Sequence, residues 1–250
     1  MNFKLTIQYD GTEFHGWQMQ GELRTVQGEL TRALCLIEGS HVVVHGSGRT
    51  DAGVHAEGQV ASVDLQKTIT PEKLRAAING NVGQDLRVTD VQAVADEFHA
   101  RYSALGKTYL YRVMNGPVMS PFWLRYAHHE ARALDLELMN QSAKLFLGLH
   151  DWTAFSSAQS DAETRMRTIT DLRVNGRWDE RGGCQLIETT VSADGFLRYM
   201  VRSIAGTLMA VGRGEIDFSI VQRAISDGDR SLVGATAPAG GLTLLSVRYE

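Results

Sequence analysis

Apolar residues recur at two regular spacings in the first part of the chain, and these spacings restrict its fold more than any other feature. Between Phe3 and Tyr9 apolar and polar residues alternate, which is typical of a half-buried strand. Thr70 and Pro71 form a helix start, with a threonine cap and a proline at the first helical position. The spacings predict strand 3–9, helix 26–37, strands 41–45 and 58–64, helix 70–79 and strand 86–94. This β-α-β-β-α-β order is the ferredoxin-like pattern.

The second part of the chain repeats this order with insertions. Met200, Ile204 and Leu208 follow one helical stripe. The predicted elements are strand 107–114, helix 134–147, strands 168–175 and 184–192, helix 196–211, a small helix 219–226 and strand 242–249. No repeat of roughly 20–50 residues accompanies them, so the similarity is one of element order. We therefore predict a pseudo-duplicated α+β protein with two ferredoxin-like (RRM-like) halves, residues 1–104 and 105–250, and mainly antiparallel sheets around a central cleft.

The composition is that of an ordinary globular protein. Of the 250 residues, 43% are hydrophobic and 22% are charged, which suffices for a core. No apolar run approaches the ~18 residues of a membrane helix, and the alternating N-terminus is unlike a signal peptide. Cys35 and Cys184 lie in apolar patterns, which favours two buried thiols in a reducing compartment over a disulfide. We expect a cytoplasmic protein without membrane association.

The distribution of charge is more informative than the formal net charge of −4. Two stretches, 98–129 and 195–214, carry basic residues and no acidic ones. Such stretches can form a basic surface for nucleic acid, or they can be scattered solvated charges; both alternatives stay open. The basic residues concerned are Arg101, Lys107, Arg112 and Arg125 in the first stretch, and Arg198, Arg202 and Arg213 in the second.

The loop over residues 46–54 holds three glycines around polar residues, between two predicted strands. Glycines at this density permit backbone shapes that present side chains. Arg49 and Asp51 are two residues apart, so an extended backbone places them on the same side. The arginine would keep the aspartate ionised as a nucleophile or a general base, or the two would form a structural pair that stiffens a turn. A phosphate cradle is disfavoured, because no helix start follows the glycines.

Two further segments fit contacts with nucleic acid. Arg198 and Arg202 lie four residues apart on helix 196–211, opposite its apolar stripe, so they could meet phosphates or form a solvated face. Arg202 could also reach inward to a carboxylate. Tyr109 and Tyr111 share one face of strand 107–114, where they could stack on bases or belong to the core with their hydroxyls at its edge.

Several other chemistries lack their sequence patterns. There is no cysteine or histidine spacing typical of zinc, no dinucleotide fingerprint, and no nucleophile elbow around Ser47. The segment 128–130 lacks the ligand spacing of a helix and is expected at the surface. We therefore expect a chemistry that needs neither a metal nor an organic cofactor.

Six motifs in chain order resemble those of the tRNA pseudouridine synthase A family. The segment 48–56, which contains Asp51, resembles the family's signature, and the matches run from Tyr9 to Tyr249. Six motifs in order are far more specific than any one of them. The other five are Tyr9-Asp10-Gly11-Thr12 with Phe14 and Gly16-Trp17-Gln18, the segment 98–104 with 107–111, Gly148 with His150-Asp151-Trp152-Thr153 and Phe155, Met200-Val201-Arg202 with Gly206-Thr207-Leu208, and Ala237-Pro238 with Gly241-Leu242 and Leu244.

The resemblance implies a homodimer of chains with two ferredoxin-like halves and a basic cleft for tRNA. It implies an isomerase that converts uridine to pseudouridine at positions 38, 39 and 40 of the anticodon stem-loop, without a cofactor. It also implies that Asp51 is the essential catalytic aspartate, that Tyr109 contacts the target uridine and that Arg202 pairs with Asp51. Three further residues are implied as contacts to the base, the RNA or the active site: Leu244, Arg49 and Arg101.

Two other functions compete with this one. A non-catalytic RNA-binding protein of RRM-like units would tolerate replacement of Asp51, but the chain lacks the Gly-Phe-aromatic run of such proteins. A metal-dependent RNA hydrolase would need clustered carboxylates or histidines, and the loop that holds Asp51 offers one acid.

Overall fold

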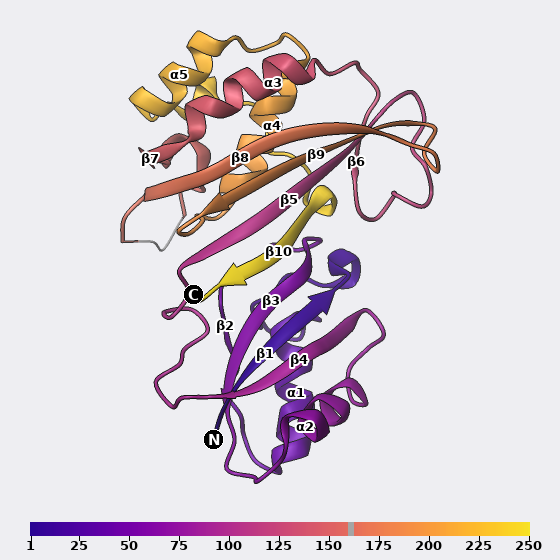
Figure 1. Cartoon of the computed structure of the whole chain (residues 1–250), viewed down its shortest axis with the longest axis vertical. Coiled ribbons are helices and arrows are strands. Elements are labelled where there is room, and N and C mark those ends of the chain that lie inside the picture. Colours follow the sequence, from indigo (N-terminus) through magenta and orange to yellow (C-terminus); the bar gives the residue numbers. More distant parts are fainter. Residues whose placement is uncertain (160–162) are drawn as a thin grey trace. The chain divides into compact units, whose positions relative to one another are not determined.

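The structure, a computed structural model, describes residues 1–159 and 163–250, which group by their contacts into two compact units (Figure 1). The first unit contains Met1–Leu105 and Thr243–Glu250, and the second contains Gly106–Leu242. Both units combine helices with strands that pair mostly antiparallel, which confirms the α+β class. None of the helices described is long and apolar enough to cross a membrane.

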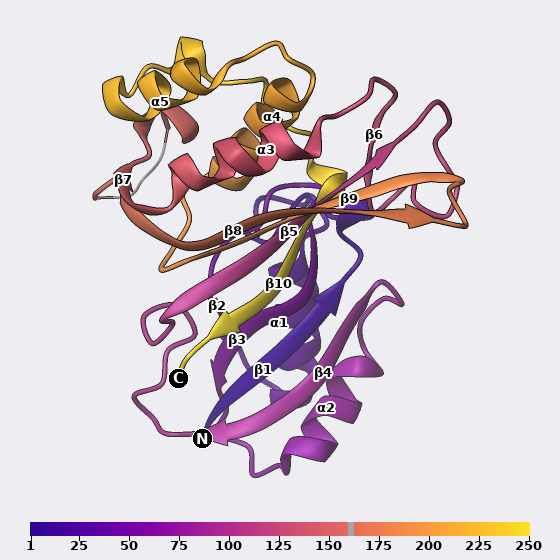
Figure 2. The same ribbon diagram turned by 45° about the horizontal axis from the view of Figure 1, so that its top comes forward.

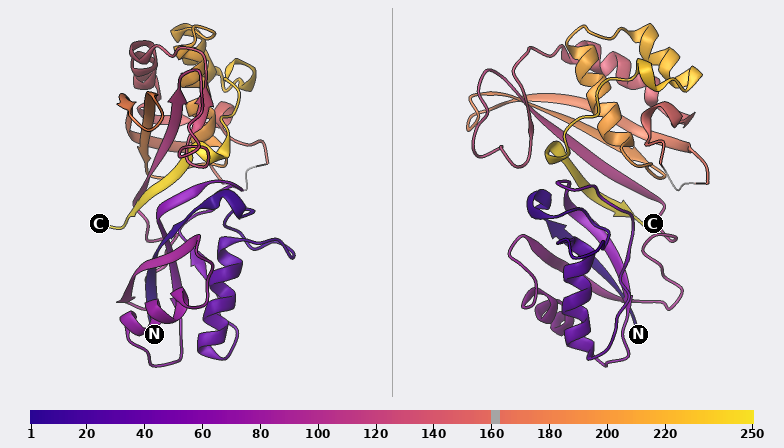
Figure 3. Two further views of the ribbon diagram at one scale, coloured as in Figure 1. Left: turned by 90° about the vertical axis from the view of Figure 1, so that its right-hand side faces the viewer. Right: turned by 180° about the vertical axis from the view of Figure 1, so that it is seen from behind.

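The first unit is a sheet with two helices on one face (Figure 3). Strand β1 lies between β3 and β4 and pairs antiparallel with both. The other edge of β3 pairs antiparallel with β2 and parallel with β10. The elements are β1 (Asn2–Tyr9), α1 (Val26–Glu38), β2 (His45–Gly46), β3 (His55–Asp64), α2 (Pro71–Asn79), β4 (Leu86–Val94) and β10 (Leu242–Arg248).

Most elements predicted for this unit are confirmed. Helix α2 begins as expected, because the Thr70 hydroxyl accepts a hydrogen bond from the Lys73 N–H at 3.4 Å and Pro71 opens the helix. In β1 the side chains of Phe3, Leu5 and Ile7 are fully buried, so its alternation reports a real core face. The apolar periods therefore place the core of this unit correctly.

The strand predicted over 41–45 is wrong for most of its length. Only His45 and Gly46 pair with β3, opposite Ser62 and Ala61. Val42 and Val44 are nevertheless buried, whereas Val43 is exposed, so this segment has the alternating burial of a strand without a paired neighbour. Alternation of side chains records burial, and it does not record whether the backbone finds a hydrogen-bonding partner.

The second unit is a sheet covered by helices α3 and α4 (Figure 2). Strand β9 pairs antiparallel with β5 and β8, β7 pairs antiparallel with β8, and β6 pairs parallel with β5. The elements are β5 (Gly106–Asn115), β6 (His128–Glu130), α3 (Leu136–Ala143), β7 (Gly148–Asp151), β8 (Met166–Asp179), β9 (Cys184–Ala193), α4 (Met200–Gly212) and α5 (Phe218–Asp227).

Helix α4 differs from its prediction in a way that matters for the site. It begins at Met200, so Arg198 precedes it rather than sharing a helical face with Arg202. All its residues except Arg202 are buried. The helix face predicted to be shared by Arg198 and Arg202 is therefore wrong. The apolar stripe marked the core side of the helix correctly, but small residues on its other faces are buried too.

Three smaller differences concern short elements and the C-terminal strand. The helix predicted over 134–147 is α3 followed by a 3₁₀ turn, Lys144–Phe146. Strand β6 was expected as a surface segment, but Glu130 in it is buried. Strand β10, predicted over 242–249, pairs with β3 of the first unit through Thr243 and Leu244.

Candidate active site

The loop that carries Asp51 connects β2 to β3 in the first unit, and its backbone is fixed by the segment that follows β1. The N–H of Trp17 donates to the Thr50 carbonyl at 3.0 Å, and the N–H of Gly53 donates to the Phe14 carbonyl at 3.3 Å. Within the loop, the Val54 N–H donates to the carbonyl of Asp51 at 3.1 Å. The backbone on both sides of the half-exposed Asp51 is therefore anchored.

Two glycines of this neighbouring segment are required by its close approach to the loop. A Cβ on Gly11 would lie 2.0 Å from the Val54 carbonyl oxygen. Gly16 has φ +88°, and a Cβ there would lie 2.7 Å from the carbonyl oxygen of Thr50. The segment that contains these glycines therefore packs, backbone against backbone, on the loop that contains Asp51.

Gly16→Ala is expected to lower the free energy of unfolding by about 3 kcal/mol, from the left-handed backbone and the clash together. Gly39→Ala is the matched control, because Gly39 has φ +84° and a Cβ on it would meet no other atom within 4 Å. It should lose only about 1 kcal/mol. Urea unfolding of the two variants measures the difference, and equal losses would show that the contact with Thr50 carries no energy.

Buried polar side chains support the loop from below. The Tyr9 hydroxyl shares a 2.8 Å hydrogen bond with the Thr50 hydroxyl. The Ser47 hydroxyl donates to Gln59 Oε1 at 2.7 Å, and Gln59 Nε2 donates to the Gly48 carbonyl at 3.1 Å. Burial raises the pKa of Tyr9 to about 12, although its hydrogen bonds to Thr50 and Gln59 act in the opposite direction. Tyr9 is therefore a neutral hydrogen-bonding group at physiological pH.

Asp10 and His55 form a second support at the ends of the anchoring segments. Asp10 Oδ1 accepts hydrogen bonds from the N–H and the hydroxyl of Thr12. His55 Nδ1 accepts from the Gly11 N–H at 3.0 Å and lies 3.3 Å from Asp10 Oδ1. Asp10 and His55 therefore hold the segment that follows β1 against the start of β3.

Gln59 is a supporting residue that sequence reasoning missed. Its side chain is fully buried in β3, where it joins Ser47 to Gly48 across the base of the loop. A signal was present, since Gln59 is the one amide in an otherwise apolar or small stretch of strand. A buried amide must find partners, and the nearest unpaired groups are those of an irregular loop.

The other predicted site residues of the first unit occupy different surroundings. Arg49 lies in the same loop and is exposed. Leu244 is buried in β10, where it pairs with Ala56 on the strand that leaves the loop. Arg101 is exposed in the segment after β4, with its guanidinium 5.7 Å from the centre of the Tyr102 ring.

The two predicted tyrosines of the second unit are both buried but have different contacts. Tyr111 is buried and its hydroxyl donates to the Pro238 carbonyl at 2.9 Å, so it is a core tyrosine of the kind considered above. Burial raises its pKa, although the charge of Arg202 acts against this. Tyr109 pairs with Val191 across the sheet, and its ring meets that of Phe196 edge to face at 5.0 Å.

Arg202 is held by the loop that precedes β10. Its Nε donates to the Ala237 carbonyl at 2.7 Å, and its own carbonyl accepts from the Ala237 N–H at 3.0 Å. The Tyr199 ring lies 5.2 Å from its guanidinium carbon, and Tyr199 adopts φ 68°, a left-handed conformation that non-glycine residues rarely take. Arg202 is therefore fixed from both its backbone and its side chain.

Glycines again permit this arrangement. A Cβ on Gly206 would lie 1.8 Å from the Ala235 carbonyl oxygen, and one on Gly241 would lie 2.7 Å from the Tyr111 ring. The motif at 200–208, the segment 235–241 and the strand of Tyr111 therefore pack on one another within the second unit.

Acids from other parts of the chain pair with some arginines of the acid-free stretches. Arg112 Nε lies 3.1 Å from Glu188 Oε1, and Arg213 lies 2.9 Å from Glu130 and 2.7 Å from Glu215. These two arginines fit neither a basic surface nor scattered solvated charges. A stretch without acids in sequence is not a region without acids in space.

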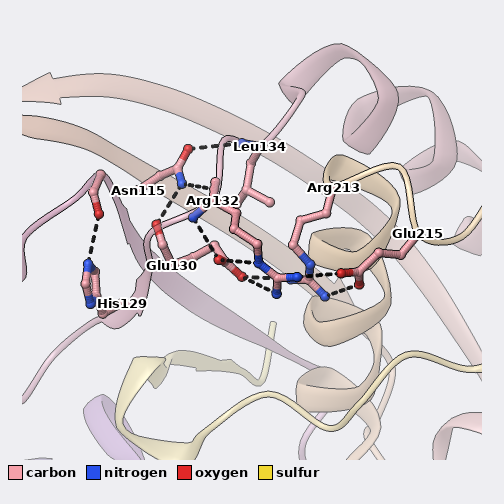
Figure 4. Close-up of polar contacts among 8 residues, drawn as sticks. Asn115, His129, Glu130, Arg132, Leu134, Arg213 and Glu215 are labelled. Atoms are coloured by element: carbon pink, nitrogen blue, oxygen red, sulfur yellow. Dashed lines mark hydrogen bonds and ion pairs between the residues drawn. The ribbon is translucent and has the colours of Figure 1, made fainter.

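Figure 4 shows the larger of these ion-pair groups, which joins β5, β6 and the end of α4. Glu130 accepts hydrogen bonds from Arg132 and Arg213, and Glu215 accepts from the same two arginines. The Asn115 amide donates to the carbonyls of Glu130 and Arg132. Burial alone would raise the pKa of Glu130, but the arginines hold it below its usual value. This ion-pair group therefore has a structural role, because it holds β6 against the end of α4.

The described part of the chain contains no group of three His, Cys, Asp or Glu side chains that could hold a metal ion. Cys35 and Cys184 are both free thiols, as expected; Cys184 is buried and Cys35 is half-buried.

Comparisons with known proteins agree with these motifs. The family model described as tRNA pseudouridine synthase matches residues 5–103 and 142–250. The tRNA pseudouridine synthase A of Methylacidiphilum infernorum (isolate V4) is 43% identical over 250 residues, 100% of this chain and 96% of that protein. Those of Clostridium botulinum (strain Alaska E43 / Type E3) and Streptococcus thermophilus (strain CNRZ 1066) are 42% and 40% identical, over 99% and 100% of both chains. The chain therefore belongs to the tRNA pseudouridine synthase family.

Proposed function

We propose that this enzyme isomerises uridine to pseudouridine at positions 38, 39 and 40 of the tRNA anticodon stem-loop, with Asp51 as the essential carboxylate. The observation that carries the assignment of Asp51 is the anchored loop. Backbone hydrogen bonds at Thr50, Asp51 and Gly53 and the buried side chain of Gln59 hold it in one conformation. A catalytic group held in advance avoids the cost of being ordered during the reaction.

The reaction itself suits a single carboxylate. The C–N glycosidic bond breaks, the base turns, and a bond forms between the sugar and a carbon of the base. Atoms and electrons balance within the nucleotide, because the proton lost from that carbon is matched by the one gained on nitrogen. An ionised carboxylate can act as a nucleophile or as a base in such a sequence.

The remaining site residues are proposed in the roles that the family implies. Tyr109 contacts the target uridine and Arg202 pairs with Asp51. The two hydrogen bonds between Arg202 and Ala237 support this, because a fixed guanidinium can hold a carboxylate in one orientation. Three other residues are proposed to contact the base or the RNA: Leu244, Arg49 and Arg101.

We also propose that the chain forms a cytoplasmic homodimer whose protomers have two ferredoxin-like halves, residues 1–104 and 105–250. The element order of the first unit, β-α-β-β-α-β, supports this for the first half.

The target base must leave its stack to be modified, which costs a few kcal/mol that contacts with RNA must offset.

The experiment is to incubate the purified protein with an unmodified tRNA transcript and map pseudouridine by chemical modification. We expect conversion at positions 38, 39 and 40, and no requirement for an added metal or organic cofactor. A transcript with cytidine at these three positions is the control and should show no pseudouridine. Failure to modify any transcript that carries uridine at these positions would contradict the proposed function.

A further inference from the structure

The segment 98–103, which follows β4, is rigid in its backbone and open to solvent in two of its side chains. The Phe98 carbonyl accepts from Asn2 Nδ2 at 2.8 Å, and the Ala100 carbonyl accepts from the Tyr249 hydroxyl at 2.7 Å. The Ala100 N–H donates to the Ser62 hydroxyl at 3.1 Å. This turn is thus tied to three strands or strand ends of the first unit.

Its exposed side chains continue a row of aromatic rings. The ring centres of His45 and His99 are 4.8 Å apart, and those of His99 and Tyr102 are 4.5 Å apart. Tyr102 is 77% exposed, and the Arg101 guanidinium lies 5.7 Å from its ring centre. His45 lies in β2, which leads directly into the loop of Asp51. We call His45, His99 and Tyr102 the aromatic row.

The middle ring of the aromatic row is held in one orientation. His99 Nδ1 accepts hydrogen bonds from the N–H groups of Arg101 and Tyr102 at 3.1 and 3.4 Å. Burial lowers the pKa of His99, and the charges of His45 and Arg101 lower it further. The imidazole, fixed in this way, packs against the Tyr102 ring at an angle of 36° between the ring planes.

A pocket of about 610 Å³ borders the aromatic row. His45, Phe98 and His99 contribute to its lining, as do Asp64 and Asp96. The Asp64 carboxylate is paired with the N-terminal amine at 2.8 Å. Carboxylates repel phosphate, so the nearby cation available to an RNA phosphate is Arg101, beside Tyr102.

We propose that the aromatic row is a second RNA contact, in which an unpaired base of the tRNA stacks on Tyr102 and an adjoining phosphate meets Arg101. A fixed aromatic platform next to an arginine is the usual way in which proteins hold unpaired bases. The ordered turn beneath Tyr102 reduces the entropy lost on binding. The inference rests on the proposed function, since it takes tRNA as the ligand.

The test compares Tyr102→Ala with Tyr102→Phe by the Kd for an unmodified tRNA transcript. We expect Tyr102→Ala to raise Kd about 5- to 150-fold, the range for loss of one stacked base, and Tyr102→Phe to change it less than about threefold. Leu36→Ala is the control for removal of an exposed apolar side chain, since Leu36 is 65% exposed on α1. It should leave Kd unchanged.

The salt dependence of binding separates stacking from charge. Arg101→Ala should reduce the slope of log Kd against log salt by roughly 0.7–0.9, the value for one phosphate contact, and Tyr102→Ala should leave that slope unchanged. Abasic substitutions made one at a time at the unpaired nucleotides of the transcript should include one that weakens binding to the wild type but not to Tyr102→Ala. If no position behaves in this way, stacking on Tyr102 is wrong.

Each adverse outcome has a distinct meaning. If the wild type makes pseudouridine and Tyr102→Ala binds tRNA normally, the aromatic row is not an RNA contact while the proposed function stands. If Tyr102→Phe loses as much affinity as Tyr102→Ala, the hydroxyl acts and stacking is wrong. If Tyr102→Ala changes the molecular mass by light scattering, the row is a contact between chains instead. A wild type without activity overturns the proposed function itself.

Discussion

Asp51→Asn is expected to lower the rate of pseudouridine formation by at least about 10³-fold, because the amide is neither a nucleophile nor a base of comparable strength. The substitution keeps the shape of the side chain. The backbone hydrogen bonds of Thr50, Asp51 and Gly53 and the support from Gln59 do not involve the carboxylate. The variant should therefore fold normally and bind tRNA with an affinity close to that of the wild type.

Single-turnover mapping of pseudouridine on one transcript measures this effect, and a filter-binding Kd reports tRNA binding in parallel. Asp64→Asn is the matched control, because Asp64 is an exposed aspartate of the same unit whose carboxylate binds the N-terminal amine. It should leave the rate within about twofold. Near-normal turnover by folded Asp51→Asn would show that another group supplies the catalysis.

Glu130→Ala is expected to have the largest effect on stability, a loss of about 3–5 kcal/mol in the free energy of unfolding. Its carboxylate lies within hydrogen-bonding distance of Arg132 and Arg213, and the side chain of Arg213 is only 14% exposed. Arg213 Nε already lacks a hydrogen-bond partner among the described residues. Removal of Glu130 would leave this mostly buried cation with Glu215 as its remaining partner.

Calorimetry should show this loss as a Tm lower by roughly 10 °C. Glu215→Ala is the comparison, since Glu215 binds the same two arginines but is 43% exposed, and it should cost no more than about 1 kcal/mol. Glu130→Gln should fall between them, because it keeps an acceptor oxygen without the charge. Equal losses for Glu130→Ala and Glu215→Ala would show that burial does not set the strength of this ion-pair group.

The fold could be predicted where the structure of a segment is set by its own residues. The strand around Phe3 and the helix that starts at Pro71 follow directly from local spacing and capping. The segment around Val43 could not be predicted. Its residues alternate like those of a strand, but in the folded protein its backbone has no neighbouring strand to pair with before His45. The burial of α4 on nearly all sides was equally out of reach, since small residues such as Gly206 and Ala210 carry no periodic signal.

The site divides in a similar way. Asp51 and Arg49 were identified in their loop from residue type and glycine spacing. The loop sequence by itself does not decide whether they are catalytic or form a structural pair. The support from Gln59 and Tyr9 depends on contacts across the sheet that no single stretch of sequence contains. The same holds for the partners of Arg213, which come from β6 and from the residues after α4. Order along the chain identifies the parts, and their mutual support is a property of the fold.

The pairing of β10 with β3 has a consequence for how the protein matures. Thr243 and Leu244 lie beside His55 and Ala56, and Gly58 admits the backbone of Leu245 closely. These partners lie 188 residues apart in the sequence, so the pair closes a long loop late in folding. During synthesis on the ribosome, the sheet beneath Asp51 lacks this strand until residues 242–248 have emerged. A chain released before that point would carry the loop of Asp51 on an incomplete sheet, so the support of the active site is completed by a segment made long after the loop itself.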